Sequence, residues 1–417
     1  MDKLVENLVS RLVRKGSLEV HLSSGHVIRA GDGSGQLVAV RFGSRAAEMR
    51  LLSDPELALG ELYMDGELTL LRGDIYELLE LGLRNLDANG QAAWLKALQS
   101  VRIGLRRFAQ NNVGNRSVRN VAHHYDLDGK LYSLFLDSDR QYSCAYFEHP
   151  EDSLEDAQLA KKRHIAAKLL VEPGHRALDI GCGWGGMGLY LANNCGAAVT
   201  GVTLSQEQLA VAKGRAADQN LTGRVDFRFQ DYRAVSEKFD RIVSVGMFEH
   251  VGVGYFDTYF QKVAELLDDN GVALIHTIGR TDRPGATNPW IAKYIFPGGY
   301  IPAMSEVLPA IERAGLIVTD IEVLQLHYAE TLKAWRQRFM ARWEEAAALY
   351  DERFCRMWEF YLAGSEASFR LGQMVNFQFQ LAKNVNTVPM TRDYIADRER
   401  MLRARDSGRP AIRMAGE

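Results

Sequence analysis

The sequence predicts an α/β protein whose main domain is a doubly wound parallel sheet, preceded by a small α+β domain. From about residue 160, short and almost continuously apolar segments alternate with helical ones. The apolar segments lie at 175–186, 197–205, 224–231, 240–250 and 271–279, with helical patterns such as 205–220 and 255–270 between them. Strand–helix alternation of this kind forms a parallel sheet that helices cover on both faces. Ligands of such sheets bind at the carboxyl ends of the strands, which is where we look for site residues.

Residues 1–95 carry the pattern of the small α+β domain. Apolar pairs recur with helical spacing in 3–15, and apolar and polar residues alternate around Gly-rich turns in 17–42. The segments 54–70 and 74–86 have helical patterns. The basic residues of the first helix, Lys3, Arg11, Arg14 and Lys15, could contact anionic lipid, although packing of this helix on its own domain is the simpler interpretation. Residues 96–120 are predicted to form a polar linker.

A glycine-rich turn follows the first strand of the main sheet. In LDIGCGWGG (178–186), Asp179 stands ahead of Gly181 and Gly183. Glycines at this point let the backbone approach a ligand closely at the start of a helix. Dinucleotide-binding folds share the pattern, but their third, helix-packing glycine is displaced here, and Asp179 is placed to meet an amino-acid portion of the ligand. The turn therefore favours S-adenosylmethionine over a nicotinamide dinucleotide.

The next two strand ends supply polar groups to the same site. The second strand runs into GVTLSQEQ (201–208), with Thr203 and Gln208 where many nucleotide-binding folds place a carboxylate for the ribose. After the third strand, Asp231 is predicted to bind the adenine amino group and Tyr232 to stack on the base. Taken singly, Gln208 and Tyr232 fit a solvated helix start and a packed loop equally well. Three strand ends together predict a cofactor site.

The fourth strand ends in SVGMFEHVG (244–252), with Glu249 and His250 side by side. Adjacent side chains of an extended backbone face opposite ways. If Glu249 faces the reacting centre, His250 is therefore expected to support a neighbouring loop. The pair has no third ligand at short spacing and predicts no metal site. His123 and His124 are likewise interpreted as loop-ordering residues, and Cys182 as a small residue in a tight turn.

The C-terminal part of the chain is expected to be helical and then exposed. The aromatic-rich segment 331–382 is interpreted as a long helical region that packs on the sheet, with the wall of a channel for a long apolar ligand as the alternative. The main domain is thus predicted to span 121–390. The charged residues 391–417 are expected to form an exposed tail.

The composition narrows the class of protein. The chain has 417 residues and a formal net charge of -3, which leaves no electrostatic footprint for nucleic acid. The four cysteines lack CxxC spacing and are predicted to be free thiols in a reducing compartment. No stretch reaches the roughly 20 apolar residues of a membrane span, and the N-terminus lacks the features of a signal peptide. We expect a cytoplasmic protein, a location that still permits work at a membrane surface.

A combination of short motifs in the second half of the chain is highly specific. These motifs are HHYDL (123–127), QYSCAYF (141–147), LDIGCGWGG, GVTLSQEQ, FDRIVSVGMFEHVG (239–252), HTIG (276–279), PWIAKYIFPGGYIP (289–302) and HYAETLKAW (327–335). Together they resemble the cyclopropane fatty acid synthases and the related mycolic acid cyclopropane synthases, in the order of that family. The resemblance implies a Rossmann-like methyltransferase sheet with helical additions and, less distinctively, a lipid-transfer-like N-terminal domain.

The resemblance also implies a reaction, a set of site residues and partners. The family transfers the methyl group of S-adenosylmethionine to a cis double bond of a phospholipid acyl chain, and a bound bicarbonate removes a proton to close a cyclopropane ring. Unsaturated phospholipid in a bilayer, transient association with the inner face of the membrane, and a homodimer are further expectations. The implied bicarbonate site comprises Cys144, Glu249, His276, Ile278 and Tyr328, with Cys144 and Ile278 acting mainly through backbone groups. The implied cofactor site comprises Tyr142, Ser143, Asp179, Gly181, Gly183, Thr203, Leu204, Gln208, Asp231 and Tyr232.

Several alternatives stay open at this point. From the residues alone, Glu249 could itself be the base, and only the resemblance favours bicarbonate. A methyltransferase of the same fold could instead leave a methyl-branched or methylated olefinic chain. A lipid-binding protein with an inactive methyltransferase domain is the alternative outside enzymes.

Overall fold

The computed structural model describes residues 2–85 and 129–406, which form two compact units. Unit 1 contains 2–85, 286–297 and 332–373 of these residues. Unit 2 contains 129–285, 298–331 and 374–406. The predicted linker 96–120 and the pair His123 and His124 lie outside the described residues. Two segments assigned from the sequence to the main domain, 286–297 and 332–373, group with unit 1.

Unit 1 is built on a four-stranded sheet with the order β2-β1-β3-β4. Strand β1 (Ser17–His21) pairs antiparallel with β2 (Val27–Ala30) and parallel with β3 (Leu37–Phe42), and β4 (Leu68–Arg72) runs antiparallel to β3. The segment 54–70, expected to be helical throughout, changes to a strand because Gly66 turns the chain with a φ of 75°. The four helices of this region are α1 (Asp2–Leu12), α2 (Arg45–Ser53), α3 (Pro55–Met64) and α4 (Ile75–Arg84).

The first helix packs on its own unit, as the simpler interpretation held. Val5 and Val9 of α1 are buried in a core with residues of the four-stranded sheet, whereas the basic side chains of the helix lie on its exposed face. Unit 1 also contains α12 (Pro289–Tyr294), α15 (Trp343–Leu349), α16 (Glu352–Leu371) and the later part of α14 (His327–Ala341). Helix α16 packs against α3 and α4.

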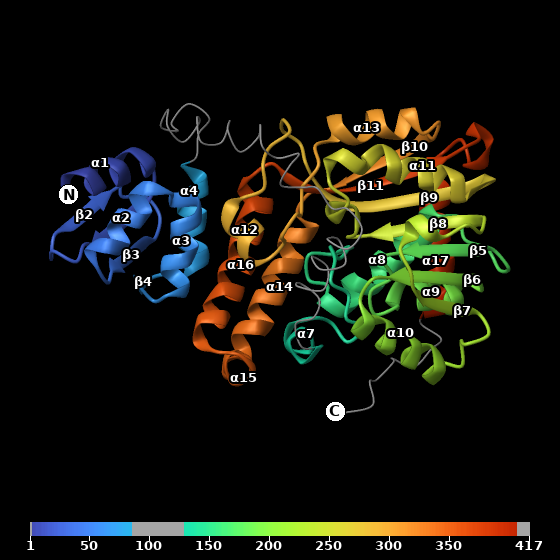
Figure 1. The fold of residues 1–417 in the computed structure, drawn as a ribbon, viewed down its shortest axis with the longest axis horizontal. Coiled ribbons are helices and arrows are strands. Elements are labelled where there is room, and N and C mark those ends of the chain that lie inside the picture. Colours follow the sequence, from blue (N-terminus) through green and yellow to red (C-terminus); the bar gives the residue numbers. More distant parts are fainter. Residues whose placement is uncertain (1, 86–128, 407–417) are drawn as a thin grey trace. The chain divides into compact units, whose positions relative to one another are not determined.

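Unit 2 carries a seven-stranded sheet with the order β10-β11-β9-β8-β5-β6-β7 (Figure 1). Its strands are β5 (Arg176–Ile180), β6 (Ala198–Thr203), β7 (Val225–Phe229), β8 (Phe239–Val245), β9 (Leu267–Arg280), β10 (Ile317–Leu324) and β11 (Met374–Ala382). The five predicted strands β5 to β9 are parallel, as expected. The sheet as a whole is mixed, because β11 runs antiparallel to both β9 and β10.

Strand β11 corrects the expectation that 331–382 is helical throughout. In this strand polar Asn376, Gln378 and Gln380 alternate with apolar residues, a period of two that fits a strand and not a helix. Almost every residue of β11 is buried, so the amide side chains lie inside the protein. The helical interpretation was based on the apolar content of the segment. It failed here because amide side chains alternate with apolar ones along a strand that is buried on both faces.

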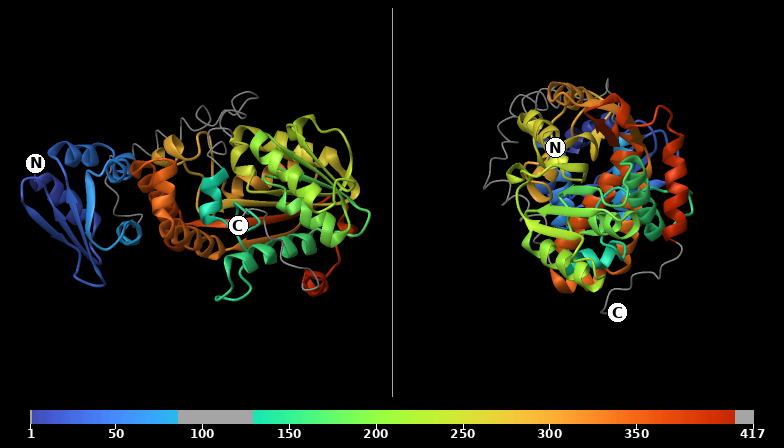
Figure 2. Two further views of the ribbon diagram at one scale, coloured as in Figure 1. Left: turned by 90° about the horizontal axis from the view of Figure 1, so that it is seen from below. Right: turned by 90° about the vertical axis from the view of Figure 1, so that its right-hand side faces the viewer.

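Helices cover both faces of the large sheet, which confirms the doubly wound arrangement. Helices α8 (Leu154–Lys168), α9 (Gly186–Cys195), α10 (Gln206–Asp218) and α17 (Asp393–Asp406) share one apolar core with the sheet, and α11 (Phe256–Leu266) and α13 (Met304–Arg313) share the other. A short helix, α7 (Gly129–Phe135), precedes them. The segment expected to be an exposed charged tail forms α17 up to Asp406, which lies beside α8 and buries Ile395 and Leu402 (Figure 2).

Candidate active site

A pocket opens in unit 2 at the carboxyl ends of the parallel strands. Its empty space, including the solvent-filled mouth, is about 1260 Å³. The wall is formed by the glycine turn after β5, the ends of β6 and β8, the segment that follows β7, and residues 140–143. All ten residues expected to bind the cofactor line this pocket, namely Tyr142, Ser143, Asp179, Gly181, Gly183, Thr203, Leu204, Gln208, Asp231 and Tyr232.

The glycine turn has a backbone that only glycine adopts easily. Gly181, Gly183 and Gly185 have φ values of 80°, 54° and 84°, which L-residues with a side chain rarely adopt. A Cβ atom at Gly181 would also lie 2.8 Å from the Met247 side chain, and one at Gly185 would lie 2.7 Å from the Phe227 ring. The turn therefore brings bare backbone and the start of α9 to the pocket wall.

Asp179 presents an unpaired carboxylate oxygen at this turn. Its side chain is buried, and the Gly188 backbone N–H donates to it, but among the described residues its Oδ2 has no hydrogen-bond partner. Burial raises the pKa of Asp179 to about 7, against the effect of that hydrogen bond. A buried carboxylate in this state gains a great deal from a cationic partner. The pocket thus fits a ligand that carries an ammonium group here.

The other strand ends hold polar groups in fixed positions. Ser205 caps α10 by accepting from the Gln208 N–H at 3.3 Å, and Thr203 Oγ1 lies 3.3 Å from Gln208 Oε1. Asp231 is held by Arg233, whose Nε lies 2.9 Å from Asp231 Oδ1. Burial alone would raise the pKa of Asp231, but the hydrogen bonds from Arg233 outweigh it and lower that pKa. The Tyr232 ring is packed edge-on against Tyr259.

The five residues expected to hold bicarbonate do not line this pocket. Four of them belong to what we call the polar cluster, defined as Cys144, Glu249, His276, Ile278, Asn376 and Gln378. The Ile278 backbone N–H donates to Glu249 Oε1 at 2.6 Å. His276 Nε2 lies 2.5 Å from Asn376 Nδ2, and its Nδ1 lies 3.1 Å from Gln378 Nε2.

Strand pairing explains how the polar cluster forms. In the register of β9 with β11, His276 stands opposite Gln378 and Ile278 opposite Asn376. Residues two apart on a strand share a face, so these four side chains gather on one side of the sheet. The Asn376 amide also bonds the buried Cys144 thiol. The cluster adjoins the cofactor pocket, because Cys144 follows Ser143 in the chain and Glu249 precedes His250, and both Ser143 and His250 line the pocket.

Tyr328 lies at the start of α14, next to the segment that carries Cys144. The Ala145 N–H donates to Thr331 Oγ1 at 3.0 Å, and the Phe147 N–H donates to His327 Nδ1 at 3.0 Å. The first turn of α14 is therefore fixed against residues 145–147, and Tyr328 is buried in that turn.

Burial favours the uncharged forms of the ionisable groups in the polar cluster, which also contains unused acceptors. Burial raises the pKa of Glu249 to about 7, opposed by its hydrogen bond from Ile278, and burial lowers the pKa of His276 well below its usual range. Among the described residues, Glu249 Oε2, Asn376 Oδ1 and Gln378 Oε1 are buried without a hydrogen-bond partner. Buried polar atoms are normally paired, so the cluster fits a small polar species that can donate hydrogen bonds to these oxygens. The Ile278 N–H, expected to contact such a species, is occupied by Glu249.

The expectation that His250 supports a neighbouring loop is corrected by the structure. Asn376 and Gln378 are site residues that the sequence did not predict. Residues Phe248–His250 form a 3₁₀ turn, so neighbouring side chains do not alternate there, and His250 lines the cofactor pocket. Burial lowers the pKa of His250 to about 4, which keeps its ring neutral. The two amides were missed because their strand was taken as helix. Their alternation with phenylalanines is the signal that could have identified them.

Three further observations concern metal binding, the cysteines and membrane spans in the described residues. Within them no group of three or more His, Cys, Asp or Glu side chains is arranged to hold a metal ion. All four cysteines are buried and free, as predicted. No helix in the described part of the chain is long and apolar enough to cross a membrane.

Comparison with known proteins adds the family context. Residues 113–379 match the family model described as mycolic acid cyclopropane synthetase. The chain is 40% identical over 338 residues to cyclopropane-fatty-acyl-phospholipid synthase of Escherichia coli K12, which covers 81% of this chain and 85% of that protein. It is 36% identical over 349 residues to tuberculostearic acid methyltransferase of Mycobacterium tuberculosis, covering 78% of this chain and 79% of the relative.

The fold comparison agrees with the sequence comparison. A crystal structure of a mycolic acid cyclopropane synthase complexed with SAH and CTAB aligns with a TM-score of 0.60 at 34% identity. The alignment covers 63% of this chain and 97% of the solved chain.

Proposed function

The chain belongs to the mycolic acid cyclopropane synthetase family of S-adenosylmethionine-dependent methyltransferases, and from this premise we propose that it closes cyclopropane rings on the unsaturated acyl chains of phospholipids. It is an enzyme that uses S-adenosylmethionine in cyclopropane or methyl fatty acid synthesis. The ring as product and the phospholipid as substrate are the proposal. The observation that carries it is the polar cluster, a set of buried acid–base groups that adjoins the cofactor pocket and is separate from it.

The cofactor pocket would hold S-adenosylmethionine by its two ends. When bound, the cofactor supplies an electrophilic methyl group on a positively charged sulfur. Asp179 would pair with the ammonium group of the amino-acid end, and the glycine turn would leave room for the carbon chain of that end. Asp231 and Tyr232 would contact the adenine. An alkene is a weak nucleophile that no side chain can activate by deprotonation. The protein therefore contributes mainly by orienting the double bond and excluding water.

The polar cluster would provide the base for ring closure. A carboxylate placed directly against a sulfonium and a carbocation would itself be at risk of methylation. Glu249 does not line the cofactor pocket, and its free Oε2 can accept a hydrogen bond from a small ion. The Asn376 and Gln378 amides and the neutral His276 can orient the other atoms of that ion. These donors and acceptors fit bicarbonate, which we propose as the group that takes the proton.

A second product class is supported by one specific comparison. The relative named tuberculostearic acid methyltransferase is 36% identical over most of the chain. A chain that methylates the double bond and loses its proton from another carbon would leave a methylated olefin, and reduction would give a methyl branch. The presence of Glu249, His276 and Tyr328 favours ring closure, because in this proposal they would hold a base beside the transferred methyl. The alternative of a lipid-binding protein without activity is set aside by the family assignment.

The proposed substrate lies in a bilayer, so we propose that the enzyme works at the inner membrane surface. The apolar face of α1 is used within unit 1, where Val5 is fully buried. Lys3 and Arg11 of this helix and Arg14 just after it are exposed, so they are available to anionic lipid headgroups. Contact of this kind is electrostatic and therefore reversible and sensitive to salt.

Lipid mass spectrometry tests the proposed function. The chain is expressed in a bacterial host that lacks enzymes of this family, and the phospholipid acyl chains are analysed before and after hydrogenation. Ring closure predicts a gain of one CH₂ together with loss of the double bond. A gain of CH₂ with a retained double bond would support the methylated olefin instead, and unchanged lipids would refute both products.

A further inference from the structure

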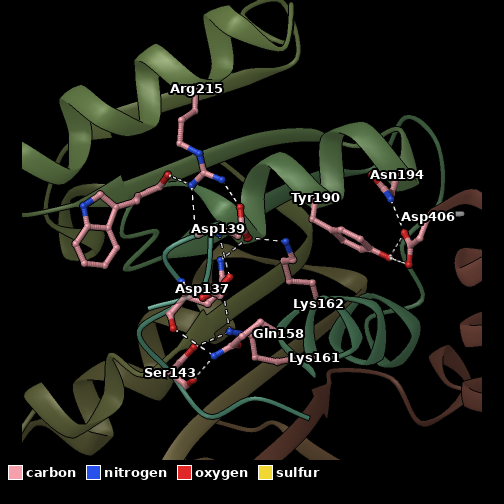
Figure 3. A network of polar contacts seen from close by, with 12 residues as sticks. Asp137, Asp139, Ser143, Gln158, Lys161, Lys162, Tyr190, Asn194, Arg215 and Asp406 are labelled. Atoms are coloured by element: carbon pink, nitrogen blue, oxygen red, sulfur yellow. Dashed lines mark hydrogen bonds and ion pairs between the residues drawn. The ribbon is translucent and has the colours of Figure 1, made fainter. Parts of the chain in front are cut away.

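A fully buried lysine stands behind the cofactor pocket. Lys161 of α8 has no exposed surface, and its ammonium group donates to Gln141 Oε1 at 2.6 Å and to Ser143 Oγ at 2.7 Å (Figure 3). Ser143 lines the pocket, whereas Lys161 does not. Within the described part of the chain Lys161 forms no ion pair, although a buried charge is costly without a counter-charge.

The neighbouring carboxylates act on this ammonium group, but within the described residues none of them forms an ion pair with it. Asp139 is paired with Lys162 at 2.5 Å and with Arg215 (Figure 3). Asp137 accepts two backbone N–H groups, from Asp139 at 3.0 Å and from Gln141 at 2.8 Å. The network therefore combines three cations with two carboxylates. One positive charge is left over, and the polar atoms that Lys161 touches lead to the pocket wall.

The contact with Lys161 decides which way the Ser143 hydroxyl points. A lysine ammonium group can only donate hydrogen bonds, so Ser143 Oγ must act as the acceptor in this pair. Its own hydrogen is then directed to some other acceptor. The backbone of the same residue is held as well, because Gln158 Nε2 donates to the Ser143 carbonyl at 3.0 Å. Ser143 is thus a fixed donor at the pocket wall.

Together with Asp179, this donor matches the two charges of an amino acid. Asp179 Oδ2 is an unpaired acceptor on the same pocket, and the Lys161 charge is close enough to act on the Asp179 carboxyl. The other cations of the pocket wall have carboxylates of their own: Arg233 binds Asp231, and Arg140 lies beside Glu207. An α-amino acid group needs an acceptor for its ammonium and a donor, preferably backed by positive charge, for its carboxylate.

We propose that Lys161 is a positioning residue that turns the Ser143 hydroxyl toward the carboxylate of the cofactor's amino-acid end and supplies the counter-charge for it. This inference rests on the proposed function, because it takes S-adenosylmethionine as the ligand of the pocket. The excess positive charge of the network is then balanced when the cofactor binds. The amino-acid end becomes the part of the cofactor whose binding depends on Lys161.

Two ligands separate this role from a structural one. S-adenosylhomocysteine has the amino-acid end, whereas 5′-methylthioadenosine has the adenosine and sulfur without it. Binding of both is measured by calorimetry to the full chain and to Lys161→Met, Ser143→Ala and the double variant. Lys161→Met is expected to weaken S-adenosylhomocysteine binding by about 10- to 100-fold, as for loss of a charged hydrogen bond. Binding of 5′-methylthioadenosine should change by less than about twofold, and this binding also reports that the variant is folded.

The variants also test whether Lys161 acts on the ligand through the Ser143 hydroxyl. If Lys161 acts through that hydroxyl, the double variant loses no more than the stronger single variant, so that the two effects are not additive. Lys162→Met is the matched control, because it removes a cation from the same helix and network that does not touch Ser143. It should affect both ligands alike. Lys161→Gln keeps a hydrogen-bond donor and loses the charge. It should also weaken S-adenosylhomocysteine binding more than 5′-methylthioadenosine binding, by a smaller factor than Lys161→Met. It replaces Lys161→Met in the experiment if that variant does not fold.

Three results would overturn the inference. Equal loss of both ligands in Lys161→Met and Lys161→Gln would assign Lys161 a structural role only. Unchanged S-adenosylhomocysteine affinity in these variants, with loss in Arg140→Met, would place the carboxylate at Arg140 instead. If the unaltered chain binds 5′-methylthioadenosine but not S-adenosylhomocysteine, or binds neither, the cofactor assignment fails first and the inference fails with it.

Discussion

Glu249 and His250 are neighbours in the chain but serve different parts of the site. The 3₁₀ turn at the end of β8 places His250 at the cofactor pocket and Glu249 in the polar cluster. Glu249 keeps one oxygen on the Ile278 N–H and leaves the other without a partner among the described residues. The division implies that changes at Glu249 affect proton removal without affecting cofactor binding.

Glu249→Gln tests that separation of roles. The amide keeps the acceptor for the Ile278 N–H but cannot carry negative charge, so turnover should fall by about 100-fold or more, the usual contribution of an acid–base group. Calorimetric affinity for S-adenosylhomocysteine should stay within about threefold, well below the effect of losing a charged contact. Asp179→Asn is the matched comparison, and it should weaken cofactor binding. Loss of cofactor affinity in Glu249→Gln would contradict the role assigned to Glu249.

The raised pKa of Asp179 predicts that cofactor binding releases a proton. Its pKa in the empty pocket is raised by burial to about 7, and contact with an ammonium group favours the ionised form and lowers this pKa. Binding below pH 7 must therefore release a proton, and the affinity should rise as the pH increases from about 5.5 to 7. The pKa of His250, also in the pocket, is about 4, so this histidine does not titrate in that range.

Calorimetry at pH 6 in two buffers of different ionisation enthalpy measures the released proton. The proton release should disappear in Asp179→Asn. If it persists in that variant, another group such as Asp137, whose pKa is raised by burial to about 6, is the source.

Single residues also show what sequence can and cannot predict. Eight of the ten cofactor residues lie in the glycine turn or at and just after strand ends, where local pattern and topology together determine position. Tyr142 and Ser143 lie in the segment before α8 and were expected only from the resemblance, and all ten line one pocket. The orientation of Glu249 and His250 depended on the assumption of extended backbone, which a three-residue turn breaks. The roles of Asn376 and Gln378 depend on pairing with β9, about a hundred positions earlier in the chain, which no local pattern reports.

At the scale of elements, α3 depends on a glycine for packing. A Cβ atom at Gly60 would lie 2.4 Å from Nε1 of the buried Trp290 ring in α12. A glycine in a helix interior costs up to about 1 kcal/mol relative to alanine, so the substitution would stabilise α3 if space allowed. Forcing an extra methyl into a packed core costs about 1–3 kcal/mol. The steric term is the larger one.

Gly60→Ala is therefore expected to destabilise unit 1 by about 1 kcal/mol or more. Gly82 of α4 is the control from the same unit, because a Cβ atom there meets nothing within 4 Å. Gly82→Ala should leave stability unchanged or raise it by about 0.5 kcal/mol. Denaturant unfolding of both variants makes the comparison. Equal effects would mean that Trp290 moves aside without cost.

Helix α17 is held on unit 2 by its last described residue. The buried Asp406 carboxylate accepts from Arg163 at 2.7 Å. It also accepts from Asn194 at 2.6 Å and from Tyr190 at 3.2 Å (Figure 3). Removing one partner of a buried ion pair leaves the other charge without compensation. Here Arg163 keeps its second carboxylate, Glu148, at 3.0 Å, which reduces the loss.

Asp406→Ala should cost about 2 kcal/mol, less than the full penalty for a broken buried pair, and should speed amide exchange along α17. Asp397 of the same helix is the control, because its side chain is 58% exposed and bonds only Arg400 among the ion pairs of the described residues. Asp397→Ala should change stability by less than about 0.5 kcal/mol. Hydrogen-exchange mass spectrometry gives the local readout. If the two variants exchange alike, Asp406 does not anchor the helix.

Helix α17 and strand β11 are two elements that the sequence did not predict correctly. The parallel strands β5 to β9 follow from apolar runs that alternate with helices, and they were predicted correctly. Helix α17 was expected to be an exposed tail because its sequence is dominated by charge. Some of those charges pair with α8, as in Asp406 with Arg163 and Glu399 with His164. Ile395, Leu402 and the partly buried Tyr394 supply the apolar contacts. Charge complementarity between distant segments decides such a case, and it is not visible in one segment alone.

For the whole molecule, the reaction is proposed to take place in unit 2, which contains both the cofactor pocket and the polar cluster. In this proposal the electrophile binds in the pocket that Tyr142, Ser143 and His250 line, and the base is held by the adjoining polar cluster. Such a separation would protect the base from methylation while keeping it close to the transferred carbon. The central claim is that the proton removed after methyl transfer comes from that methyl group.

An isotope experiment tests this claim most directly. The purified full chain is given S-adenosylmethionine with a trideuterated methyl group and vesicles of a cis-unsaturated phospholipid, and the acyl products are analysed by mass spectrometry and NMR. The account predicts a saturated ring whose new methylene carries two deuterons, because one deuteron leaves when the ring closes. A product that retains all three deuterons would contradict it, because the proton would then have left from another carbon and the polar cluster would not serve ring closure.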